Sequence, residues 1–135
     1  MSTNPYDTYL EATVLSAEPT ELVRILYRTA IESVRDARAY LADGNIAARS
    51  RAISKAVTIL AELGLCLKSD VEPRLAKNLN ELYDYMRRRL LTANLNQVEE
   101  PLAEVVGLLE NLLEAWEKIE VQPASEQMEL ATAGF

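Results

Sequence analysis

Apolar residues recur along most of the chain at the three- and four-residue spacing that places side chains on one face of an α-helix. Four stretches with this pattern follow one another, at residues 19–42, 46–67, 74–95 and 102–119. Leucine, isoleucine, valine and alanine dominate the apolar face of each stretch. No stretch shows the two-residue alternation that is typical of a half-buried strand. The pattern therefore predicts an all-α protein.

Short breaks separate the four stretches, and their residues are typical of helix ends. Gly44 suits the left-handed position that follows a helix, and Asn45 can cap the helix after it. A Glu-Pro pair occurs at residues 18–19, 72–73 and 100–101, and proline is favoured in the first turn of a helix. Helices joined by short breaks pack as antiparallel neighbours. We therefore predict an antiparallel up-down four-helix bundle over residues 19–119.

Length and charge restrict the classes of partner. The chain has 135 residues and a formal net charge of −7, which indicates one acidic domain. Such a domain repels phosphate backbones and anionic lipid, so we expect neither nucleic-acid binding nor membrane insertion. The N-terminus lacks the pattern of a signal peptide, and a single cysteine, Cys66, suits a reducing compartment. These features favour a cytoplasmic protein.

The residue types that most enzymes need are scarce in this sequence. It contains no histidine, which removes Ser-His and Cys-His nucleophile pairs and histidine metal ligands. Its four glycines are scattered, so no phosphate-binding loop can be assembled from them. We therefore expect no enzyme activity, no cofactor and no metal.

The predicted helices carry more apolar surface than a bundle core requires. The apolar arc of the second helix spans roughly 180°, against the roughly 100° that suffices to meet neighbouring helices. A surplus of this kind indicates a binding groove, with Ile59 expected on the outer part of the arc. An equally open interpretation is a homodimer or adaptor bundle that uses the same surface for self-association. The candidate groove residues are Ala52, Ala56, Ile59, Leu63, Tyr83, Tyr85, Leu108 and Leu112.

Both ends of the chain lie outside the predicted bundle. Residues 1–18 carry the apolar and aromatic side chains of Tyr6, Tyr9, Leu10 and Val14, and we interpret them as a segment that covers part of the groove. A permanent strap that completes the core is the alternative, and the sequence does not separate the two. Residues 120–135 show little periodicity, and we expect a mobile tail.

Three blocks of the sequence resemble one known family. They are "NPYDTYLEATVLSAEPTELVRILYRTAI" (4–31), "NLNELYDYMRRRLLTAN" (78–94) and "EVVGLLENLLEAW" (104–116). In this order they resemble the flagellar export chaperones that serve flagellin, the FliS family. The resemblance covers roughly residues 4 to 119.

The resemblance implies a specific function. Members of this family are helical bundles that bind the disordered C-terminal segment of newly made flagellin in the cytoplasm. They prevent its premature polymerisation and deliver it to the flagellar type III export apparatus, with the export gate as a second expected partner. Recognition of this kind lays helices of the cargo into apolar grooves and couples binding to folding.

Overall fold

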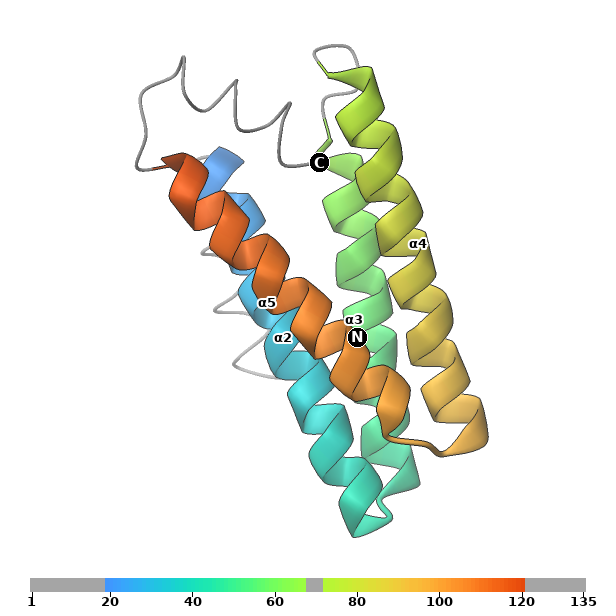
Figure 1. Cartoon of the computed structure of the whole chain (residues 1–135). Coiled ribbons are helices and arrows are strands. Elements are labelled where there is room, and N and C mark those ends of the chain that lie inside the picture. The colour runs from blue at the N-terminus through green and yellow to red at the C-terminus, as the bar shows by residue number, and fades with distance from the viewer. Residues whose placement is uncertain (1–18, 68–71, 121–135) are drawn as a thin grey trace.

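The computed structural model describes residues 19–67 and 72–120, and every regular element among them is an α-helix. Figure 1 shows the four helices running antiparallel in the order of the chain. Their bounds are α2 (Pro19–Asp43), α3 (Ile46–Leu65), α4 (Pro73–Asn96) and α5 (Glu100–Glu120). Helix α2 packs on α3 and α5, and α4 packs on the same two helices. The prediction of an all-α four-helix bundle is confirmed.

The helix ends follow the signals that the sequence carries. Gly44 has a positive φ of 72° after α2, and the side chain of Asn45 accepts a hydrogen bond from the amide of Ala48 at 3.2 Å. Glu72 precedes Pro73 at the start of α4. Gln97, which caps the C-terminal end of α4, is a non-glycine residue with a φ of 55°. The left-handed turn at Gln97 begins the short connection from α4 to α5.

The core runs along the centre of the bundle and consists of the predicted inner faces. Its largest fully buried aliphatic side chains come from all four helices: Val34, Ile53, Leu60, Leu63, Met86, Leu90, Leu102, Val105 and Leu109. The helical spacing also predicts Leu22, Leu82 and Trp116 on the inner faces, and the structure leaves them half-buried and packed against this core. The helical periodicity therefore predicted the inner faces, but not which of their residues would be only partly buried.

The predictions for the two ends of the chain lie outside the described residues. They concern the covering segment with Tyr6, Tyr9, Leu10 and Val14, and the tail over residues 120–135, of which only the backbone of Glu120 is described. The division into covering segment, bundle and tail stays a prediction.

Candidate functional site: an open groove between α2 and α3

An open groove runs along the surface between α2 and α3, and we call it the α2–α3 groove. Its volume is about 620 Å³. The residues that line it are Ser33, Asp36, Tyr40, Ala48, Arg51, Ala52, Ser54, Lys55, Thr58 and Ile59. Small and apolar side chains from α3 form its floor, and hydroxyl and charged groups surround them. A concave surface with an apolar floor and a few polar groups is the usual form of a binding site.

The charged groups of the α2–α3 groove come from both helices. Arg51 and Lys55 stand on α3, and Asp36 stands opposite them on α2. Partial burial and the neighbouring negative charge of Glu32 raise the pKa of the Asp36 carboxyl, while Lys55 acts in the opposite direction. With two cations and one carboxylate, the groove is more basic than the acidic chain as a whole.

Two of the eight candidate groove residues line the α2–α3 groove. Ala52 is half-buried there, and Ile59 forms part of the wall with an exposed fraction of 7%. The expectation that Ile59 lies on the outer part of the α3 arc is wrong, because its side chain packs into the core cluster. A carboxylate at this position would therefore be buried among apolar side chains.

Four candidate residues lie in the core of the bundle. Ala56, Leu63, Tyr83 and Leu112 are between 0% and 6% exposed. They support the surface from below and are not themselves on it. A cargo contact with any of them requires that the helices move apart.

Tyr83 belongs to a buried aromatic pair that joins diagonal helices. Its hydroxyl oxygen lies 2.5 Å from that of Tyr27 on α2, and the ring centroids are 6.4 Å apart. Burial raises the pKa of both Tyr27 and Tyr83. A hydrogen bond between two buried hydroxyls satisfies polar groups that would otherwise be costly to bury, so Tyr83 has a structural role.

The remaining two candidates, Tyr85 and Leu108, lie on the side of the bundle formed by α4 and α5. The hydroxyl of Tyr85 donates a hydrogen bond to Glu104 at 2.6 Å, and Arg89 donates to the other oxygen of that carboxylate at 2.6 Å. These two hydrogen bonds lower the pKa of Glu104. Leu108 is half-buried. The eight candidates are therefore distributed over two surfaces and the core.

Sequence reasoning missed the contribution of α2 to the groove. Ser33, Asp36 and Tyr40 recur at three- and four-residue spacing, the signal of one helix face. No large apolar residue stands among them, so the hydrophobic pattern does not mark them as part of a groove. The structure shows that this polar face is one wall of the α2–α3 groove.

Among residues 19–67 and 72–120, six large apolar side chains are exposed, and four of them gather where α3 begins and α4 ends; we call these four the end patch. They are Ile46 (58% exposed), Leu91 (54%), Leu95 (82%) and Val98 (42%). Because α3 and α4 are antiparallel neighbours, these residues share one end of the bundle. A cluster of exposed apolar side chains is typical of an interaction surface.

Two further properties of the described residues bear on other classes of function. No group of three or more His, Cys, Asp or Glu side chains within residues 19–67 and 72–120 is arranged to hold a metal ion. In the same part of the chain, no helix is both long enough and apolar enough to span a membrane.

A helical bundle whose notable surfaces are grooves and apolar patches defines a binding protein. The chain matches the family model described as "Flagellar protein FliS" over residues 2–123, and it belongs to this family. It is 43% identical over 112 residues to the flagellar secretion chaperone FliS of Salmonella typhimurium, covering 82% of each chain. The flagellar secretion chaperones FliS of Escherichia coli K12 (34%) and Bacillus subtilis 168 (32%) match over 85% of each chain.

Membership in the family decides two earlier predictions. The resemblance seen in the three sequence blocks is confirmed, since the family model spans all of them. The family is one of flagellar secretion chaperones, so the prediction that the chain is not an enzyme is also confirmed.

Proposed function

We propose that this chain is a cytoplasmic chaperone that binds the disordered C-terminal segment of flagellin. Binding keeps that segment from polymerising prematurely, and the complex then delivers it to the flagellar type III export apparatus, with the export gate as a further partner. The observation that carries the proposal is the open α2–α3 groove in a member of the flagellar secretion chaperones.

The α2–α3 groove fits a segment that folds as it binds. Its floor offers Ala52 and the edge of Ile59 to apolar anchors, while Arg51 and Lys55 can pair with carboxylates of the cargo. Ordering a disordered segment costs free energy, so the affinity per area is moderate and release at the export apparatus remains feasible. Tyr85 and Leu108 extend the proposed contact to the α4–α5 side.

Titration calorimetry with a flagellin C-terminal peptide tests this proposal. Ala52→Glu places a long charged side chain in the groove and should weaken binding about tenfold or more, a change of roughly 1.4 kcal/mol. Ala47→Glu is the matched control, because Ala47 lies on the same helix, is exposed and is not among the groove residues. Equal affinities of the two variants would exclude the α2–α3 groove, and no binding by the parent chain would contradict the proposed function.

The end patch favours a second candidate function, a homodimer or adaptor bundle. Leu95 is 82% exposed, and Ile46 and Leu91 in the same patch are more than half exposed. Self-association would cover these apolar side chains. Light scattering after size-exclusion chromatography separates the candidates. A parent chain with the mass of a dimer, together with a Leu95→Glu variant with the mass of a monomer, would favour the homodimer.

A further inference from the structure

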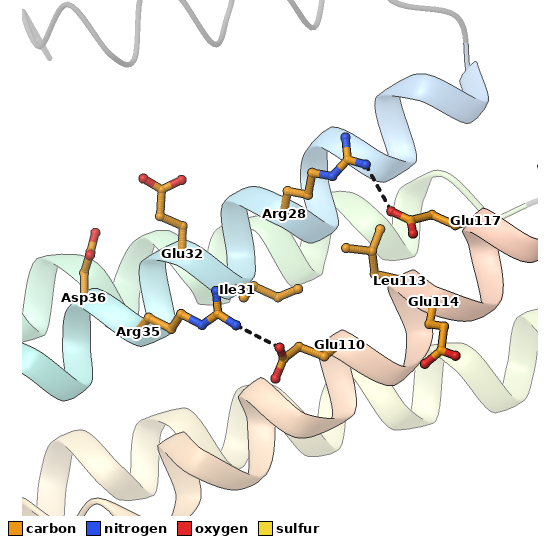
Figure 2. A pocket seen from close by; sticks show the side chains of 9 residues that line it. All are labelled: Arg28, Ile31, Glu32, Arg35, Asp36, Glu110, Leu113, Glu114 and Glu117. Atoms are coloured by element: carbon orange, nitrogen blue, oxygen red, sulfur yellow. Dashed lines mark hydrogen bonds and ion pairs between the residues drawn. The ribbon is translucent and has the colours of Figure 1, made fainter.

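A second groove lies on the other side of α2, between α2 and α5, and we call it the α2–α5 groove. Its volume is about 640 Å³. Figure 2 shows Ile31 and Leu113 facing each other across it, with charged side chains around them. Ile31 is buried and Leu113 is half-buried, so together they form a short apolar floor.

Two ion pairs cross this groove. Arg28 on α2 pairs with Glu117 on α5 at 3.0 Å, and Arg35 pairs with Glu110 at 2.8 Å. The two arginines are seven residues apart, which is two helical turns or about 10 Å. Ile31 lies between them in the sequence, so the apolar floor is framed by the two pairs (Figure 2). All four side chains are about half exposed, and exposed pairs of this kind contribute little stability.

The margins of the α2–α5 groove are acidic. In Figure 2, Glu32 and Asp36 project from α2 on one side, and Glu114 projects from α5 on the other. Lys118 pairs with Glu114 at 3.2 Å within α5. The lining holds five carboxylates and two arginines, which gives it a net charge of −3. The α2–α3 groove, with Arg51 and Lys55 against Asp36, carries the opposite sign.

We propose that the α2–α5 groove docks a basic amphipathic helix of a partner protein. Its apolar stripe rests on Ile31 and Leu113, and its lysine or arginine flanks lie over Glu32 and Glu114. Complementary charge steers such an encounter and selects against acidic partners.

The opposite charges of the two grooves imply two separate occupants. A segment suited to the acidic α2–α5 groove is repelled by Arg51 and Lys55, and a segment suited to the α2–α3 groove meets repulsion at Glu32 and Glu114. The chain therefore holds its cargo on one side of α2 and the basic helix on the other. This inference goes beyond the proposed flagellin contact and does not depend on it.

Calorimetric titration with a designed peptide tests the inference. The probe is a helical peptide with leucines at i and i+4 and lysines on both flanks, and its counterpart carries glutamate at each lysine position. The lysine peptide should bind, and Glu32→Gln/Glu114→Gln should weaken it about fivefold or more. Glu62→Gln/Glu81→Gln removes the same charge from exposed sites on α3 and α4 and should change the affinity less than about twofold.

Four results would overturn the inference. The glutamate peptide could bind as well as the lysine peptide, which would show that charge does not select the occupant. Both double variants could weaken binding equally, which would show general attraction to an acidic protein. Binding that is unchanged in Leu113→Ala, with folding verified by circular dichroism, would exclude the apolar floor. A parent chain with the mass of a dimer in the absence of peptide, together with a Glu32→Gln/Glu114→Gln variant with the mass of a monomer, would show that the occupant is a second copy of this chain.

Competition distinguishes this inference from the proposed function. A saturating flagellin C-terminal peptide should leave the affinity for the lysine peptide within about twofold, because the grooves lie on either side of α2 and have only Asp36 in common. Full competition would overturn the existence of a second docking surface. A flagellin peptide that does not bind at all would contradict the proposed function only, and the titration with the double variants would still decide the inference.

Discussion

Arg49 on α3 is bound to Asn94 on α4 through both its Nε and Nη2 groups. Nε donates to the Asn94 side-chain oxygen at 2.9 Å, and Nη2 donates to the Asn94 carbonyl at 3.3 Å. Ser50 also donates to the side-chain oxygen, at 3.2 Å. The last carbonyls of a helix lack partners within it and attract positive charge. Arg49 is only 4% exposed. The side-chain oxygen and the carbonyl of Asn94, near the end of α4, therefore offset the cost of burying its guanidinium.

Replacing Asn94 should destabilise the protein through the cation left behind. Asn94→Ala removes the side-chain acceptor of a buried guanidinium, and hydrogen bonds to charged groups contribute about 1.5–3 kcal/mol. We expect the free energy of unfolding in urea to fall by about that amount. Asn96→Ala is the control, since Asn96 is exposed at the end of the same helix. Similar losses in both variants would show that the Arg49 contact is not responsible.

Leu90 and Leu91 form a matched pair for testing the core. They are adjacent on α4, with exposed fractions of 0% and 54%. Leu90→Ala leaves a cavity in the core and should cost about 2–5 kcal/mol of unfolding free energy. Leu91→Ala makes the same chemical change on the surface and should cost less than about 0.5 kcal/mol. Urea melts of both variants measure the difference, and equal effects would contradict the orientation of α4.

The buried pair Tyr27–Tyr83 should make the protein sensitive to alkali. Burial raises the pKa of both hydroxyls above the ordinary tyrosine value of about 10. A raised pKa means that the unfolded chain loses these protons first. Their contribution to stability is therefore complete below about pH 10 and is lost as the pH rises further.

Thermal melts across this range measure the loss. The melting temperature should fall above about pH 10 in the parent chain and fall less steeply in the Tyr27→Phe/Tyr83→Phe variant. Tyr40→Phe, on the half-buried margin of α2, serves as a control for the removal of a tyrosine. A double variant with the slope of the parent chain would exclude the buried pair as the cause.

The sequence predicted the helices and core well because both depend on local chemistry. The turn at Gly44 and the helix cap at Asn45 follow from the residue types at those two positions. The inner-face leucines recur at the period of an α-helix. The buried Arg49 was missed, because its burial depends on Asn94, which is 45 positions away in the chain. No local pattern distinguishes such an arginine from one on a solvated face.

The candidate groove was harder to predict because an apolar arc does not show which part a neighbouring helix covers. Ile59 and Ala52 stand on the same helix, yet the first packs into the core and the second remains half-buried at the surface. The difference depends on how α2 crosses α3, which is a property of the packed bundle. The α2–α5 groove escaped notice because its lining is mostly charged.

The role proposed for residues 1–15 can be tested by deleting them. If they cover part of the cargo groove, the bundle should stay folded without them, and binding of an apolar dye by the free protein should rise. Flagellin-peptide affinity should hold or improve, because removing an internal competitor increases the fraction of competent molecules. The gain should be at most about 1–3 kcal/mol, the usual coupling between two sites.

The permanent-strap alternative predicts the opposite pair of results for the same deletion. If the segment completes the core, its loss should lower the melting temperature sharply and weaken peptide binding in step. The control for truncation itself is deletion of residues 121–135, which removes an equal length from the other end of the chain. Calorimetric melting and peptide titration on the parent chain and both truncations separate the interpretations. A chain lacking residues 1–15 that unfolds, beside a stable chain lacking 121–135, would exclude the removable cover.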